Sequence, residues 1–533
     1  MRPSAWLAAL PVAFVAVAFV LPMAQTLAAA GSSVCGTCGT ALAYATTPYV
    51  RHVLKVALVQ AAWSTVLALA LALPLAWLHH ARRLPWPRLQ LAVHAAPFVM
   101  PVFVVVYGLQ ITLGPRGWLH AATGLDALGW LGPLGTVVLA HAYYNYGFAA
   151  RLIDASLRRR PRVLEAAART LGASPRQAFL RTTLPLLTPA ILAVALLVFL
   201  FTFGSFGVVL FMGGGHVETL ETAMYGKVQT LFADLPRAAV LGILELAVNG
   251  LLLLGYVALR RRIAPPSAEP ETPARPAGRG LAALSLAVTA AAALPLAAVL
   301  VQGFRLDGQW SLAPWRYLLA GPHGFDLAAA LRLSLLYALA STTLALLLAA
   351  ALAYGSRAAP RLRRPLEALA SLPMAGSGIL LGVAFLATFG VGGLMDIEGT
   401  VWIVLLAHTV LAFPFVARIL LPAFEARDVR FGEAARLLGA PPRAVAWRVH
   451  GPLLRPALVA AAGLAAALSL GDYGASSLLM GQATRGLSVW IAEVDGPFVP
   501  IYHAAAVALA GLLCALTLAA YLAVERMGTE VRA

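Results

Sequence analysis

Long apolar segments recur along this chain, and they restrict its possible folds more than any other feature. Three of them cover residues 190–203, 239–259 and 366–386. An α-helix needs about 20 mostly apolar residues to cross the hydrocarbon core of a bilayer, and about twelve such segments occur. They start near residues 5, 52, 89, 134, 187, 238, 281, 328, 366, 400, 455 and 502. We therefore expect an all-α, polytopic membrane protein with about twelve transmembrane helices.

Composition agrees with this class. Only 11% of the residues are charged, against roughly 25% in soluble domains. The first segment is preceded by few basic residues, so we expect a retained helix rather than a cleavable signal peptide. Cys35 and Cys38 form a CxxC pair in the first external loop, which is compatible with a local disulfide or with two free thiols. A metal site would need more ligands nearby, so neither a metal nor a cofactor is predicted.

The distribution of arginine predicts the orientation. The net charge is +17, and arginines gather in the loops after the even-numbered segments, from the second to the tenth: Arg82, Arg83, Arg88, Arg158, Arg159, Arg160, Arg162, Arg260, Arg261, Arg262, Arg357, Arg361, Arg363, Arg364, Arg427, Arg430, Arg436 and Arg443. The intervening loops hold acidic residues: Asp126, Glu218, Glu221, Asp396, Glu493 and Asp495. Since cytoplasmic loops carry an excess of Lys and Arg, we expect both termini in the cytoplasm. Nucleic-acid binding is not expected, because it needs a basic face on a folded soluble domain.

The chain contains an internal repeat. Residues 264–280 (APPSAEPETPARPAGRG) have the composition of a linker, which divides the chain into membrane domains 1–263 and 281–533. An offset of 267 residues aligns many Gly, Pro, Arg, Phe and His residues of the two halves, among them His141 with His408, Gly172 with Gly439, Pro175 with Pro442, Gly204 with Gly471 and Gly207 with Gly474. With about six crossings each, the halves form a parallel repeat about an axis along the membrane normal.

A loop motif occurs once in each half, after the fourth and the tenth segments. Its residues are Glu165, Ala166, Ala167, Ala168, Gly172, Ala173 and Ser174 in the first copy, and Glu433, Ala434, Ala435, Gly439 and Ala440 in the second. Alanine favours helix, glycine can end a helix in the left-handed conformation, and proline suits the first position of the next helix. We therefore predict two short helices with a break, with Ser174 as the cap of the second helix. An ordinary amphipathic loop helix is the alternative, and two copies at matched positions argue against it.

This motif resembles the EAA loop of ABC-importer permeases, the element that docks into a cleft of the ATPase subunit. The resemblance implies a type I importer-like fold, a pair of ATPase subunits, an extracytoplasmic substrate-binding protein, and a place in the bacterial inner membrane. The copies depart from the family pattern in two ways. Glu165 lies one residue early, and Gly451 precedes Pro452 where the family has leucine. Because the chain has no GxxxxGK[ST] motif, ATP hydrolysis is expected on a separate subunit, and the chain itself is not expected to be an enzyme.

The helix that follows each loop ends in similar residues, and these are our candidates for the translocation path: Phe203, Ser205, Phe206, Asp472 and Tyr473. Asp472 lies inside a membrane segment, where an ionisable residue is costly. It can serve as a gate or cation contact on the path, or it can cap a broken helix, and both roles remain open.

A further resemblance concerns the substrate. The stretch 203–239 is similar to thiamine-importer permeases in its glycine triplet 213–215, in Thr219 and Glu221, in Tyr225 and in Asp234. The wider resemblance, to two-domain permeases of thiamine and of ferric iron, covers nearly the whole chain. It implies thiamine or a thiamine phosphate as the substrate, with ferric iron as the alternative. An ion-coupled secondary transporter is the rival from another class, but it would usually place several ionisable residues in mid-membrane.

Overall fold

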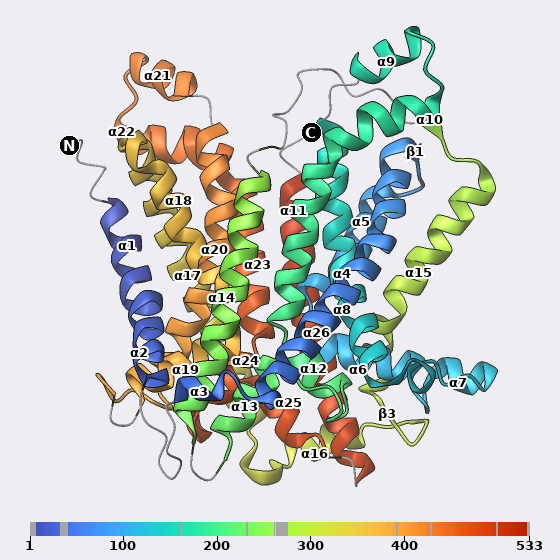
Figure 1. The fold of residues 1–533 in the computed structure, drawn as a ribbon, viewed down its shortest axis with the longest axis vertical. Coiled ribbons are helices and arrows are strands. Elements are labelled where there is room, and N and C mark those ends of the chain that lie inside the picture. Colours follow the sequence, from blue (N-terminus) through green and yellow to red (C-terminus); the bar gives the residue numbers. More distant parts are fainter. Residues whose placement is uncertain are drawn as a thin grey trace.

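The computed structural model describes residues 7–31, 41–159, 163–230, 233–260, 262, 275–390, 393–426, 429–496 and 499–529. Long helices stand side by side along one axis, and short helices cover the two ends (Figure 1). The all-α, multi-pass prediction is therefore confirmed. Cys35, Cys38 and most of the expected linker, 264–274, lie outside the described residues.

The helices of the first half, with two short pieces of strand added, are α1 (Ala9–Val15), η2 (Ala16–Val20), α2 (Leu21–Ala30), α3 (Ala41–Tyr44), α4 (Pro48–Ala81), β1 (Arg82–Arg83), α5 (Pro87–Val99), α6 (Val102–Leu113), α7 (Trp118–Thr123), α8 (Ala127–Arg159), α9 (Val163–Thr170), α10 (Pro175–Ala178), η3 (Phe179–Thr183), α11 (Leu184–Phe203), α12 (Gly207–Met212), α13 (Leu220–Val228), α14 (Leu235–Arg260) and β2 (Arg275–Pro276). Strands β1 and β2 pair in parallel.

The second half contains α15 (Arg279–Gln302), β3 (Arg305–Leu306), β4 (Gln309–Trp310), α16 (Ala313–Leu319), η4 (Pro322–Gly324), α17 (Leu327–Ala358), η5 (Pro360–Leu362), α18 (Arg363–Ser371), η6 (Leu372–Ala375), α19 (Gly378–Phe389), α20 (Val401–Ala426), α21 (Val429–Leu437), α22 (Pro442–Ala444), η7 (Val445–His450), α23 (Gly451–Gly471), α24 (Gly474–Leu479), η8 (Gln482–Thr484), α25 (Leu487–Val494) and α26 (Pro500–Thr529). Strands β3 and β4 form an antiparallel pair.

All twelve predicted segments fall on helices, but fewer of them than the twelve expected spans are long and apolar enough to cross a membrane. Within the described parts of the chain, ten helical stretches are long and apolar enough to span a membrane. The segment near residue 366 is instead a pair of helices, Arg363–Ala375 and Gly378–Phe389, that bend by 95° at their junction. The remaining segment is α8, whose middle carries His141, Asn145 and several tyrosines and is therefore less apolar. Sequence alone located the segments but not the bend.

The repeat is visible in matched helix starts. Helices α12 and α24 start at Gly207 and Gly474, and α13 and α25 start at Leu220 and Leu487. Both pairs keep the offset of 267 residues found in the sequence. The two halves therefore share one local plan.

The first helix of each half packs on the other half. Phe14 of α1 lies against Phe413 of α20, with ring centroids 6.0 Å apart. In return, α15 packs on α5 and α6, where a Cβ atom on Gly108 would lie 2.5 Å from the Pro295 carbonyl oxygen. Because of this exchange, the described parts of the two halves form a single packed unit.

Candidate coupling loops and translocation path

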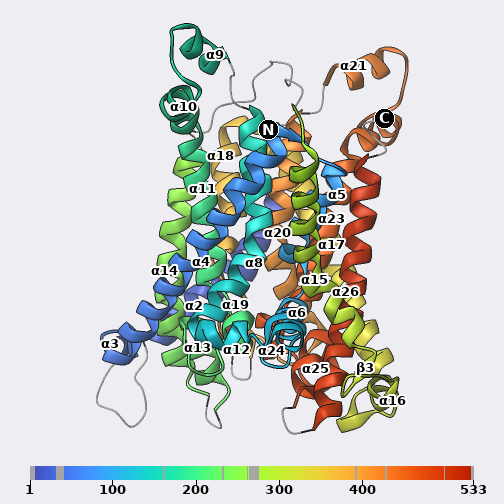
Figure 2. The same ribbon diagram turned by 90° about the vertical axis from the view of Figure 1, so that its right-hand side faces the viewer.

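The two predicted loop motifs lie at the same end of the molecule. Helices α9 and α21 project beyond the long helices there, on opposite sides of the molecule (Figures 1 and 2). The arginine-bearing strand β1, the start of α1 and the end of α26 lie at this end as well. We call it the loop end. The common placement follows from the parallel repeat, since equivalent loops emerge on the same side.

The first copy folds as the sequence predicts. Helix α9 ends in a turn in which Gly172 has a φ of 90°, a left-handed conformation that suits glycine. The Ser174 hydroxyl accepts a hydrogen bond from the Gln177 backbone N–H at 3.3 Å, and the Gln177 side chain accepts one from the Ser174 N–H at 2.9 Å. This capping box starts α10 at Pro175. The half-buried Glu165 carboxylate accepts a hydrogen bond of 3.0 Å from the Thr183 hydroxyl, which holds α9 against η3.

The second copy has the same shape with a different cap. Gly439 has a φ of 85°, and α22 starts at Pro442. Pro441 occupies the cap position, so the side-chain cap of the first copy has no counterpart here. Both loops then continue through a π-helical turn, η3 or η7, into α11 or α23. The predicted break between two helices is confirmed in both halves.

The loops expose apolar side chains. Leu171, Leu437 and Leu438 are 89%, 89% and 88% exposed. The other residues of the predicted motif lie around them, exposed at Ala166, Ala167, Gly172, Ser174, Glu433, Ala434 and Gly439, and half-buried at Ala168, Ala173, Ala435 and Ala440. These three leucines are the most exposed large apolar side chains in the part of the chain that the structure describes.

Two of the candidate path residues meet between the halves. Phe206 and Tyr473 occupy equivalent positions, and their rings stack with centroids 5.7 Å apart and planes 8° apart. Phe103 and Phe211 lie against Tyr473, and Tyr225 lies against Phe206. We call these five residues the cross-half aromatic cluster. It lies among α6, α12, α13 and α24, toward the end opposite the loops.

Glycines let the halves approach each other beside this cluster. A Cβ atom on Gly471, at the end of α23, would lie 3.2 Å from Pro101 Cα, at the start of α6. A Cβ atom on Gly204, after α11, would lie 3.4 Å from Ser377 Cβ, at the start of α19. Without a Cβ atom, each glycine lets its half lie close to the helix break of the other half.

Asp472 is engaged by neighbouring residues. Its carboxylate accepts hydrogen bonds of 2.9 and 2.8 Å from the backbone N–H and the hydroxyl of Ser476, which caps α24. The His408 Nε2 atom is 3.5 Å from the same oxygen. Of the two roles that the sequence left open for Asp472, these contacts favour the helix cap.

The remaining candidate residues lie at the edge of the cluster. Phe203 is fully buried and packs on Phe199, with ring centroids 6.1 Å apart. Ser205 is half-buried at the break between α11 and α12. The structure therefore brings Phe206 and Tyr473 together and leaves Phe203 and Asp472 in neighbouring packing.

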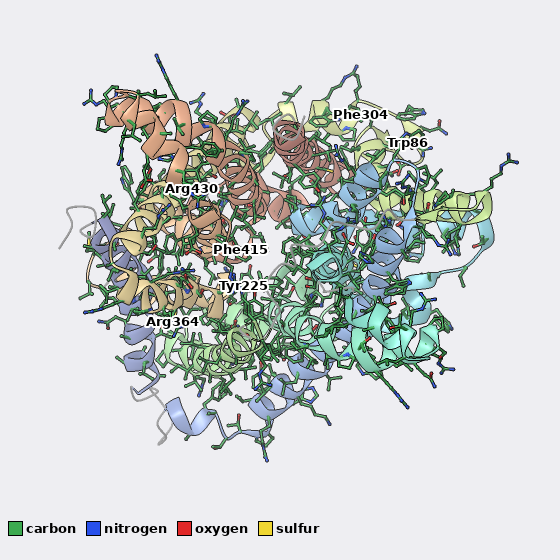
Figure 3. The ribbon with its side chains drawn as sticks, turned by 90° about the horizontal axis from the view of Figure 1, so that it is seen from above. Trp86, Tyr225, Phe304, Arg364, Phe415 and Arg430 are labelled. Carbon is green, nitrogen blue, oxygen red and sulfur yellow. The ribbon has the colours of Figure 1, made fainter. Side chains whose placement is uncertain are left out.

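A second aromatic group, which is not among the candidate residues predicted from the sequence, also joins the two halves. Phe98 stacks on Phe148 at 4.1 Å, and Phe201 lies 6.0 Å from both Phe148 and Phe415. All four rings are half-buried. Viewed from the loop end, Phe415 lies near the middle of the molecule (Figure 3). The equivalence of Phe148 and Phe415 in the repeat was the available signal.

One acidic residue is more buried than its place between two apolar segments suggests. Glu221, which we expected in an external loop, lies in the first turn of α13, at the end opposite the loops, and its side chain is fully buried. It lies beside Glu245, the single acidic residue of α14, which is also fully buried. An acid in the middle of an apolar segment was the signal that could have identified this pair.

The chain is similar to known transport permeases. It is 29% identical to the thiamine transport system permease protein ThiP of Salmonella typhimurium over 84% of each chain. It is also 29% identical to ThiP of Escherichia coli over 88% of each chain. A probable ABC transporter permease protein, y4fN of Sinorhizobium fredii, is 28% identical over 81% of this chain and 80% of its own length. The family model of binding-protein-dependent transport system inner membrane components matches twice, at residues 58–265 and 341–528, and the chain belongs to this family as a fused permease with two copies of the domain.

Proposed function

We propose that this chain forms the translocation path of an ATP-driven importer of thiamine or a thiamine phosphate. The single observation that carries the substrate is the similarity to thiamine permeases along more than four-fifths of the chain. The proposed path runs between the two halves, where Phe206 and Tyr473 stack. Aromatic faces suit a cationic thiazolium ring. We assign Asp472 to holding the break between α23 and α24, with Ser205 and Phe203 beside the path.

We propose that the two loops couple the chain to two ATPase subunits, one for each half. The support is their placement at one end and the exposed Leu171, Leu437 and Leu438. The loop end then faces the cytoplasm, together with both termini, as the arginine pattern predicts. An extracytoplasmic binding protein would deliver the substrate at the opposite end. ATP hydrolysis belongs to the separate subunits, and this chain acts as a transport permease.

Uptake in living cells tests the substrate. The chain is expressed with its cognate ATPase and binding protein in cells that lack their own thiamine importer, and accumulation of labelled thiamine and of iron is measured. We expect thiamine accumulation that requires all three components. Restored iron accumulation without thiamine accumulation would refute the substrate and leave the importer assignment standing.

A further inference from the structure

Two buried glutamates meet where the halves join. Glu221 comes from α13 and Glu245 from the middle third of α14, and neither side chain is exposed. The Glu245 carboxylate accepts hydrogen bonds from the Asn249 amide at 3.2 Å and from the Ser377 hydroxyl at 3.3 Å. Ser377 belongs to the second half, so both halves contribute to this group. We call Glu221, Glu245, Asn249 and Ser377 the carboxyl site.

The carboxyl site has more acceptors than donors. Both carboxylate oxygens of Glu221 and the Asn249 Oδ1 atom are buried and have no hydrogen-bond partner among the described residues. An ionised carboxylate only accepts hydrogen bonds, and the site offers only the Ser377 hydroxyl and the Asn249 amide as donors. Since a buried charge without a partner is expensive, the site needs either a proton or a cation.

The pair belongs to one half only. At the offset of 267 residues, Glu221 corresponds to Ser488 and Glu245 corresponds to Leu512. Other structural features occur in both halves: the loop glycines Gly172 and Gly439, and the glycines at the helix breaks, Gly204 and Gly471. The carboxyl site is therefore not part of the plan that the two halves share.

The site borders the proposed path. A Cβ atom on Gly204 would lie 3.2 Å from the Glu245 Oε1 atom, so Glu245 touches the break after α11. Two residues further along, Phe206 enters the cross-half aromatic cluster, and one turn before Gly204 lies Phe201. The carboxyl site therefore lies at the helix break that leads into the cross-half aromatic cluster, and both carboxylates and aromatic faces attract an organic cation.

We propose that the carboxyl site binds a monovalent organic cation as it passes between the halves, which for the function proposed above is the thiazolium group of thiamine. This inference rests on that function. The aromatic neighbours favour an organic cation over ferric iron, which takes a full shell of hard oxygen ligands. A passing cation would supply the positive charge that the buried acceptors lack.

The test measures discrimination by charge. Wild type and the variants Glu221→Gln and Glu245→Gln are reconstituted with the cognate ATPase and binding protein. Uptake of labelled thiamine is compared with uptake of an analogue whose thiazolium is replaced by a neutral ring. The binding protein is the same in every sample, so its own preference cancels. The control is Glu218→Gln, which removes a carboxylate that accepts a 2.6 Å hydrogen bond from Tyr49 near the same helix.

We expect the ratio of thiamine uptake to analogue uptake to fall at least tenfold in both Gln variants and to stay within twofold in the control. An unchanged ratio in the Gln variants would overturn the inference and assign the pair a shared proton and a structural role. If wild type moves no thiamine at all, the proposed function fails, and this inference fails with it. If the Gln variants do not reach the membrane, Glu245→Asp is measured instead. This variant keeps the negative charge, so its ratio of thiamine uptake to analogue uptake should stay within twofold of wild type, and a tenfold fall would overturn the inference.

Discussion

Replacing the most exposed leucines of the loops should weaken ATPase binding by a predictable amount. Leu437 is 89% exposed in the chain alone, so nearly all of its side chain is available to a partner. Burying a leucine completely stabilises by about 1.5–3 kcal/mol, and 1.4 kcal/mol corresponds to about a tenfold change in affinity. The variant Leu437→Ser should therefore raise the dissociation constant for the ATPase about tenfold to a hundredfold.

The assay is titration of the purified ATPase onto the chain in lipid nanodiscs. The matched control is Leu319→Ser in α16, where a leucine that is 72% exposed lies at the end opposite the loops. The control should bind the ATPase as wild type does. Equal, less than twofold effects of the two substitutions would contradict the assignment of the loops as the ATPase contact.

Three further predictions concern the loops, the packing and the aromatic cluster. Cysteines introduced at Ala168 and Ala435 should crosslink to the ATPase and resist labelling by an impermeant reagent outside intact cells; labelling from outside would refute the orientation. Gly474→Val should destabilise by about 1–3 kcal/mol, because its Cβ would lie 3.3 Å from backbone atoms of Gly378 and Ile379, and thermal unfolding would show this against Gly250→Val, where a Cβ meets nothing within 4 Å. A double-mutant cycle of Phe206→Leu and Tyr473→Leu should give a coupling of about 0.5–1.5 kcal/mol in the same assay, and additive effects would show that the stacking contributes nothing.

The positions at which the loop helices end and start could be predicted from the sequence. Gly172 and Gly439 end helices, and Pro175 and Pro442 start the next ones, because these preferences depend on backbone geometry that glycine and proline impose by themselves. The repeat was readable for the same reason, since the residues that align at the offset are largely of these types.

Contacts between segments that are distant along the chain could not be predicted from the sequence. The 95° bend before α19 places Ser377 against Glu245, and nothing local to either residue indicates that contact. Asp472 was recognised as unusual, but its neighbour His408 comes from another helix. Glu221 was assigned to an external loop because it lies between apolar segments, whereas tertiary packing buries it.

ATP-dependent uptake into proteoliposomes tests the central claim most directly. The chain is reconstituted with its cognate ATPase, the binding protein is added outside, and labelled thiamine is followed with ATP sealed inside. Our account predicts accumulation that requires internal ATP, the ATPase and the binding protein, and that is lost in a Leu171→Ser, Leu437→Ser double variant. Accumulation driven by an ion gradient without ATP or the ATPase would contradict the account and favour a secondary transporter.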